Sequence, residues 1–208
     1  GRFEDALEEI NSSLACNSRN HKVLALKATM LRLAGRKDEA LSVCQKSKQL
    51  DLFNYGCRYE EYLLTGDKAV LDDLINLMHK QFNNYDELAL DYWRCGQNEV
   101  AADIWQLADD NGATTAMTYY YMGLAGKEEG FDLGAKACSD YCFPNRLEAI
   151  LALQAAIDHN AEDAKAHYYL GTLYYGARQY DVAREHWLRS AELDPTFPTV
   201  WRNLALEE

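Results

Sequence analysis

The sequence predicts an all-α protein built from repeated pairs of antiparallel helices, and three observations support that prediction. Only three prolines occur in the 208 residues, at positions 144, 195 and 198, so helices can run almost uninterrupted. Apolar residues recur at i, i+3, i+4 and i+7, as in EDALEEINSSLAC and NEVAADIWQLADD, and no segment alternates like a half-buried strand. Glycines recur at spacings of 31, 30 and 30 residues, at Gly35, Gly66, Gly96 and Gly126.

Each of these glycines stands where the first helix of a pair would end. Glycine suits that place because it adopts positive φ without the steric penalty that other residues incur. The next glycine in such a position, Gly176, lies 50 residues after Gly126. This spacing predicts an insertion of about 16 residues beyond a 34-residue period. We expect the insertion in KEEGFDLGAKACSDYCFP, residues 127–144.

The C-terminal part of the chain shows the repeat most clearly. With Ala164 as position 1 of a 34-residue unit, positions 7, 8, 11, 20, 24, 27 and 32 are Leu170, Gly171, Tyr174, Ala183, Trp187, Ser190 and Pro195. One unit later, positions 4, 7 and 8 are Trp201, Leu204 and Ala205. This pattern resembles the tetratricopeptide repeat, which favours Leu-Gly, Tyr, Ala, an aromatic residue, a small residue and Pro at those seven positions.

The same frame fits the upstream chain less regularly. With Phe82 as position 1, the residues at positions 4, 7, 8, 11, 20, 24 and 27 are Tyr85, Leu88, Ala89, Tyr92, Ala101, Trp105 and Ala108. With His21 as position 1, the residues at positions 4, 8, 11, 20, 24 and 27 are Leu24, Ala28, Leu31, Ala40, Cys44 and Ser47. We therefore predict one domain over residues 1–208. Its repeats are a partial unit at 1–18, then 21–52, a degenerate pair at 53–80, 82–113, 116–161 with the insertion, 164–195, and a partial unit at 198–208.

The resemblance implies a right-handed α-solenoid, in which neighbouring helix pairs stack to bury a continuous core. It also implies a non-catalytic interaction scaffold whose first helices line a concave groove for a protein or peptide. Positions 2, 5, 9, 12 and 13 point into that groove, and here they include Trp93, Arg94, Tyr120, Tyr168, Thr172, Tyr175 and Arg202. Aromatic and Arg side chains supply much of the energy of protein interfaces. The sequence leaves open that Tyr168 and Tyr175 only cover the inner wall of the superhelix.

A second resemblance concerns the C-terminal half of the chain. Phe143-Pro144, Arg146 and the stretches HYYLG and FPTVWRNL are similar to the helical region of long bacterial proteins. In those proteins, tetratricopeptide repeats follow a β-rich domain of unknown function with a suggested link to carbohydrates. The resemblance implies a piece of a longer bacterial protein, with the adjoining domain as a partner. Phe143 and Arg146 would then form a docking element, unless the insertion only caps an irregular repeat. The alternative function is a helical accessory region that supports or contributes to a sugar site.

Composition and motifs argue against several other classes of function. Asp and Glu number 33 against 21 Lys and Arg, and the net charge of −12 disfavours nucleic acid and anionic membrane surfaces as partners. No apolar run reaches the roughly 18 residues of a membrane span. The five histidines show no HExxH, and no GxSxG, phosphate-loop or dinucleotide motif occurs. We therefore expect no catalytic residue and no cofactor.

The six cysteines lie among helical patterns without the spacing of a disulfide framework. This usage predicts free thiols in a reducing, cytoplasmic compartment. Cys138 and Cys142 form the one close pair, with His159 nearby, but a zinc site needs four ligands, so we expect no metal. Trp201 and Leu204 would lack a neighbour at the end of the stack, and exposed terminal helices of this kind favour a homodimer.

Overall fold

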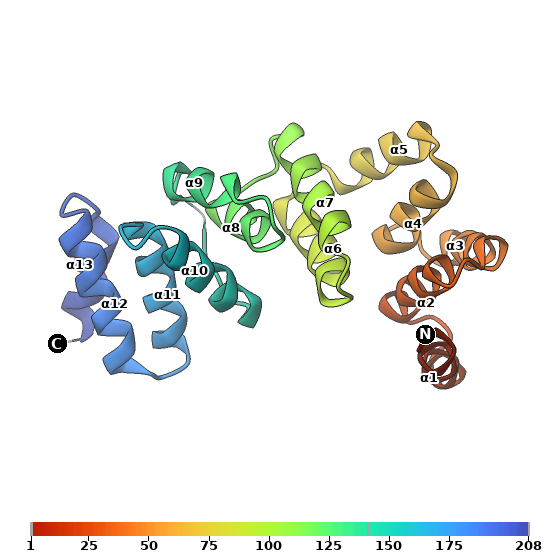
Figure 1. Cartoon of the computed structure of the whole chain (residues 1–208), viewed down its shortest axis with the longest axis horizontal. Coiled ribbons are helices and arrows are strands. Elements are labelled where there is room, and N and C mark those ends of the chain that lie inside the picture. The colour runs from red at the N-terminus through yellow and green to blue at the C-terminus, as the bar shows by residue number, and fades with distance from the viewer. Residues whose placement is uncertain (1, 141, 208) are drawn as a thin grey trace. The chain divides into compact units, whose positions relative to one another are not determined.

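The computed structural model describes residues 2–140 and 142–207. These residues form 13 helices and no strand, which confirms the all-α prediction (Figure 1). The chain divides into two compact units, residues 1–79 and 80–208. The helices of the described ranges have at most 14 residues, and none is long and apolar enough to cross a membrane. A single repeat domain over residues 1–208 stays a prediction.

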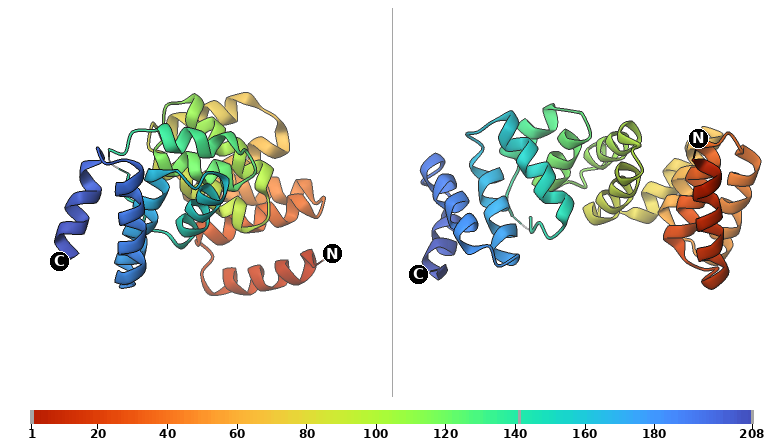
Figure 2. Two further views of the ribbon diagram at one scale, coloured as in Figure 1. Left: turned by 60° about the vertical axis from the view of Figure 1, so that its left-hand side comes forward. Right: turned by 60° about the horizontal axis from the view of Figure 1, so that its bottom comes forward.

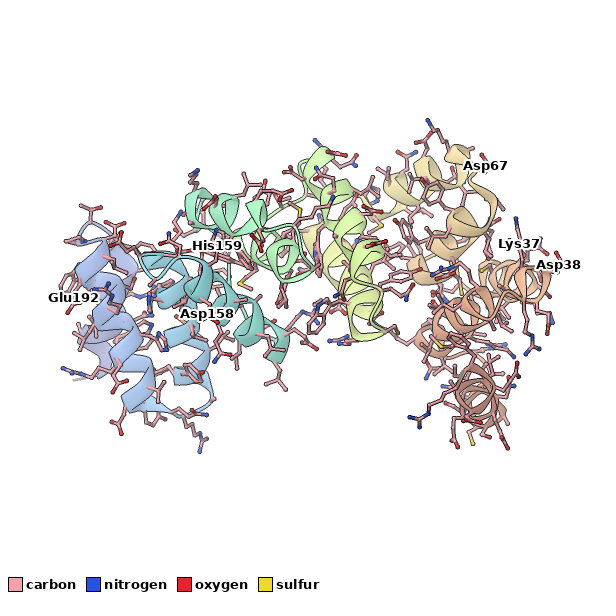
Figure 3. All side chains as sticks on the ribbon, viewed as in Figure 1. Lys37, Asp38, Asp67, Asp158, His159 and Glu192 are labelled. Carbon is pink, nitrogen blue, oxygen red and sulfur yellow. The ribbon has the colours of Figure 1, made fainter. Side chains whose placement is uncertain are left out.

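The first unit is a set of helix hairpins in which α2 is central. Its described residues, 2–79, form α1 (Phe3–Cys16), α2 (His21–Leu33), α3 (Lys37–Leu50), α4 (Tyr55–Thr65) and α5 (Lys68–Met78). Helix α2 packs against α1, α3 and α4. Asn20, Asn54 and Asp67 each accept a backbone N–H of the helix that follows, as N-caps do. Figure 3 labels Asp67 at the start of α5.

The signature positions of the 21–52 repeat are buried in this unit. Ala28 and Leu31 of α2 face Ala40 and Cys44 of α3, and all four are nearly inaccessible to solvent. Leu7 of α1 joins the same core. The small side chains of Ala28, Ala40 and Cys44 let α2 and α3 approach closely.

A buried ion pair joins α2 to α4. Glu60 of α4 is 0% exposed, and Arg32 Nε of α2 donates to its Oε2 at 2.7 Å. The Thr29 hydroxyl donates to Oε1 at 2.9 Å. Because the carboxylate is removed from water, these donors replace its hydration, and the pair ties the first two hairpins together.

The second unit repeats the hairpin arrangement with one irregularity. Its described residues form α6 (Phe82–Arg94), α7 (Asn98–Asp110), α8 (Ala116–Leu124), α9 (Glu129–Lys136), α10 (Leu147–His159), α11 (Ala164–Gly176), α12 (Tyr180–Leu193) and α13 (Pro198–Glu207). Helix α6 packs against α7, and α11 packs against α12, with which it lies side by side in Figures 1 and 2. Helix α8 packs against both α9 and α10.

Glycines allow close helix contacts in this unit. A Cβ at Gly171 would lie 2.6 Å from the Trp187 indole, so the glycine at repeat position 8 makes room for the aromatic residue at position 24. A Cβ at Gly130 of α9 would lie 2.5 Å from the Tyr119 carbonyl oxygen and 2.7 Å from the Gly123 nitrogen, both of α8. Helices α8 and α9 therefore touch backbone to backbone.

The insertion differs from the prediction because it contains a helix of its own, α9. Helix α8 also ends one turn early: in the repeats that begin at 21 and 82, the residue with positive φ stands at position 15, as Gly35 and Gly96, whereas Gly126 stands at position 11 of its repeat. Helix α9 begins immediately after this early stop and folds back onto α8.

The predicted role of Gly176 is wrong. Gly176 is the last residue of α11 and has no positive φ, whereas Arg178, two residues later, takes the positive φ of 60° in the turn that follows. Arg178 stands at position 15 of its repeat, the place of Gly96, and its N–H bonds the carbonyl three residues earlier, as that of Gly96 does. The hydrogen-bond geometry of the turn is thus retained although the residue is not glycine.

Candidate functional site

Three predicted groove residues, Tyr168, Thr172 and Tyr175, share one face of α11 because they are four and three residues apart. Tyr168 is half-buried, and its ring lies 4.8 Å from that of Phe197. The Tyr175 ring lies 5.2 Å from that of Trp187 and remains 38% exposed. Tyr168 is thus largely packed, whereas Tyr175 offers an exposed aromatic ring.

Arg202 extends this face into the next first helix. It occupies in α13 the place of Tyr168 in α11, one 34-residue unit later. Its side chain is exposed and donates to Asn203 Oδ1 at 3.0 Å. Among the side chains described, those of residues 2–140 and 142–206, none forms an ion pair with Arg202.

Arg94 is held by acidic neighbours. Its guanidinium lies 2.7 Å from Glu148 of α10 and 3.1 Å from Asp91 of α6. Burial lowers the pKa of Arg94, but these pairs together outweigh that effect and raise it above its ordinary value. The adjacent Trp93 is half-buried. In this structure Arg94 ties α6 to the first turn of α10, so a partner would have to compete with Glu148 for it.

Tyr120 contradicts the prediction that it faces an open groove. Its side chain is 0% exposed, and its hydroxyl donates to Asp163 Oδ2 at 2.8 Å. Burial, together with the Asp163 carboxylate, raises the pKa of Tyr120 well above its usual value. The cause lies in the insertion, because Gly134 of α9 sits against the Tyr120 ring. A partner cannot reach this residue without displacing α9.

Phe143 and Arg146 of the insertion both line a small pocket. Phe143 is 81% exposed, and Arg146 forms an ion pair with Glu87 of α6. The pocket has a volume of about 220 Å³ and lies between the starts of α6 and α8 and residues 142–146. We call it the insertion pocket, and its main lining residues are Phe82, Asp86, Met117, Tyr121, Phe143 and Arg146.

Asp86 is the site residue that sequence reasoning missed. It is 5% exposed, accepts a hydrogen bond from Trp105 Nε1 at 3.1 Å and another from the Thr118 hydroxyl at 3.3 Å. Burial raises its pKa to about 7, against the effect of both donors. The signal in the sequence was a pair of acidic residues, Asp86 and Glu87, between the packing residues Tyr85 and Leu88 of one helix.

A pair of histidines lies between α11 and α12. His167 Nδ1 and His186 Nδ1 are 3.0 Å apart, so one ring donates and the other accepts. The Tyr174 ring stacks on His186 at 5.7 Å. Burial lowers the pKa of His167, and burial together with the neighbouring His167 lowers that of His186. Three charged groups also shift these pKa values: Arg189 lowers and Asp163 raises the pKa of His167, and Glu185 raises the pKa of His186.

This pair predicts a loss of stability in acid. The folded pKa values lie below the unfolded value, so the stabilisation is present above about pH 6.5 and is lost as the pH falls through the folded pKa values. We expect His186→Gln to reduce the fall in Tm between pH 7.5 and 5.5. The raised pKa of Asp86 acts in the opposite direction, but it is common to both proteins and cancels in the comparison. An equal fall in Tm in wild type and variant would contradict the assignment.

His159 has neighbours other than the two cysteines near it in sequence. Its Nε2 lies 3.8 Å from Asp132 Oδ1, and its ring lies 5.2 Å from that of Phe131, at the end of α10 (Figure 3). Cys142 is buried, whereas Cys138 is exposed. In the part of the chain that the structure describes, no three His, Cys, Asp or Glu side chains are placed to hold a metal ion.

The order and packing of the described helices define a class of protein, an all-α repeat of helix hairpins. Residues 164–197 match the family model of the tetratricopeptide repeat. This match covers α11, α12 and the turn that leads to α13. The chain is therefore a helical-repeat protein with a tetratricopeptide repeat at residues 164–197.

Several solved structures align with most of the chain. YrrB, described as a TPR protein with an unusual peptide-binding site, shares 15% identity over 95% of this chain and 98% of its own, with a TM-score of 0.34. The Cut9–Hcn1 structure shares 16% over 99% of this chain and 40% of its own, at a TM-score of 0.36. MamA from Desulfovibrio magneticus RS-1 shares 19% over 95% and 88%, at 0.28. At these TM-scores the structures give no argument about what this chain binds.

Proposed function

We propose that the second unit is a non-catalytic scaffold that binds a peptide segment of a partner protein along the face of α11. The observation that supports it is the row of Tyr168, Thr172 and Tyr175, in which Tyr175 remains exposed beside Trp187. Tyrosine offers a large rigid surface with a hydroxyl, and such residues are frequent at the centres of interfaces. The exposed Arg202 adds a cation at the equivalent place of α13.

Peptide selection on the full chain tests this proposal. We expect a displayed random-peptide library to yield a binder, whose affinity is then measured by fluorescence anisotropy. Tyr175→Ala should weaken it roughly tenfold or more, as truncation of a central interface tyrosine does.

Leu188→Ala is the matched control. Leu188 is 39% exposed, almost the same as Tyr175, but it belongs to α12. This variant should leave the affinity unchanged, and circular dichroism should show both variants as helical as wild type. Equal affinities for wild type and Tyr175→Ala would contradict the proposal.

The second reading, an accessory region of a larger bacterial carbohydrate-related protein, uses the same exposed rings, since sugars also stack on aromatic faces. In that case the adjoining domain of the longer chain is the partner.

Exposed Trp201 and Leu206 on α13 and Phe3 on α1 support self-association through the terminal helices. The accessory-region function and the self-association both remain proposals beside the scaffold function.

A further inference from the structure

The insertion pocket contains an acidic group whose charge no neighbour neutralises directly. Each oxygen of the Asp86 carboxylate accepts one hydrogen bond, and both donors, Trp105 and Thr118, are uncharged. An ionised carboxylate has room for about four hydrogen bonds. Across the described ranges no cation forms an ion pair with Asp86. Two acceptor positions of a buried acid therefore remain for a ligand.

Arg146 lines the same pocket but is engaged elsewhere. Its guanidinium pairs with Glu87, the residue next to Asp86, and its charge lowers the pKa of Asp86 only from a distance. Burial outweighs this effect, since the pKa of Asp86 is raised to about 7. Ionisation of Asp86 is thus costly in the empty pocket, and a cation placed against it would relieve that cost.

The walls of the pocket suit an aliphatic chain that ends in a charge. Phe82, Met117 and Phe143 supply apolar surface, and Phe143 at the exposed rim can cover a ligand stem from outside. Lys and Arg bury their methylene groups along such surface while the head group finds a polar partner. The volume of about 220 Å³ is below the roughly 300–1,000 Å³ of small-molecule sites, so it fits one side chain.

We infer that the insertion pocket receives a single lysine or arginine side chain of a protein partner, with the cationic head against Asp86 and the stem between Met117 and Phe143. The net charge of −12 favours basic partners in the same way. The inference rests on the proposed function in taking a protein as the partner, and it assigns a second contact point beside α11. The insertion is then a specificity element, because it supplies the rim of the pocket.

The test uses small probes, so it does not require the partner to be known. The full 208-residue chain is titrated with Nα-acetyl-lysine methylamide and Nα-acetyl-arginine methylamide, and with the uncharged Nα-acetyl-norleucine methylamide. Two-dimensional NMR follows the indole N–H of Trp105, which is bonded to Asp86, and the methyl group of Met117. We expect a saturable shift of both signals with at least one basic probe and none with norleucine.

Variants assign that shift to the carboxylate. Asp86→Asn should abolish it, whereas Asp103→Asn, an exposed acid on α7, should leave it unchanged. If Asp86→Asn does not fold, Phe143→Ala keeps the test decisive, since that exposed ring can be removed without loss of packing and should weaken binding at least threefold. The inference fails if no basic probe gives a saturable shift, if the shift persists in Asp86→Asn, or if norleucine produces it equally.

The pH dependence gives a separate readout. Binding should strengthen about tenfold between pH 6 and pH 8 as Asp86 ionises. Burial raises the pKa values of Tyr121 and Cys142, the other titratable groups of the pocket lining, so both stay neutral over this range. The charged groups near Asp86 are Arg146 and Glu87. A flat profile would contradict the role of Asp86.

The outcomes separate this inference from the peptide-binding proposal. Tyr175→Ala should leave the probe shift unchanged, because its ring belongs to α11 and does not line the insertion pocket. Probe binding without any selected peptide would support the pocket and contradict the α11 face. If instead the selected peptide binds wild type but not Tyr175→Ala, and no basic probe gives a shift, the result would support the α11 face and contradict the insertion pocket.

Discussion

Replacing Glu60 by Ala should lower the free energy of unfolding of the first unit by about 3 kcal/mol. The reason is that Arg32 and Thr29 lose their common acceptor inside the α2–α4 contact. For a unit of this size the loss corresponds to a fall in Tm on the order of 10–20 °C, measurable by thermal melting followed by circular dichroism.

Two controls define the origin of that loss. Glu39→Ala breaks an exposed ion pair with Arg36 and should leave the free energy of unfolding nearly unchanged, because solvent screens such pairs. In a double-mutant cycle, Glu60→Ala should cost less when Arg32 is already Ala, because no guanidinium is then left without its acceptor. Identical costs in both backgrounds would show that the ion pair is not the cause.

Gly130→Ala and Gly176→Ala should have opposite effects on stability, although both glycines are helical. At Gly130 the new methyl group meets backbone atoms of Tyr119 and Gly123 within 2.7 Å, so α9 must move away from α8. We expect a loss of about 2–3 kcal/mol. At Gly176 a methyl group meets nothing within 4 Å, so the higher helix propensity of alanine should stabilise α11 by up to about 1 kcal/mol.

Urea denaturation of the two variants measures both effects. The midpoint should fall for Gly130→Ala and rise slightly for Gly176→Ala, at an unchanged m-value. If both midpoints rise, α8 and α9 are not in backbone contact in solution, and the short α8 would need another explanation.

The positions of the repeat residues were predictable because these residues pack against neighbours within the same helix hairpin. Leu170, Ala183 and Trp187 pack within one hairpin, so their spacing alone determines which side of each helix they occupy. The positive φ at Arg178 was not predictable in this way. The turn requires a residue with positive φ, and Arg178 adopts that conformation here at some steric cost. A search for glycine in the sequence therefore could not find this turn.

The candidate site was less predictable because it depends on the insertion. Tyr120 holds a groove position by repeat numbering, but α9 covers it. Arg94 and Arg146 appear as free cations in the sequence, yet their acidic partners Glu148 and Glu87 lie 54 and 59 residues away along the chain. Such pairings follow from the path of an irregular segment, which no periodic pattern specifies.

The covering of α8 on two sides has a consequence for how this protein could diversify. A first helix with one open face tolerates substitutions there, and repeat proteins change their partners by varying such positions. Seven of the nine α8 residues are buried, so this helix has almost no position left at which a change is free of a packing cost. New partner preferences would therefore arise more readily by mutation of α6, α11 and residues 142–146 than within α8.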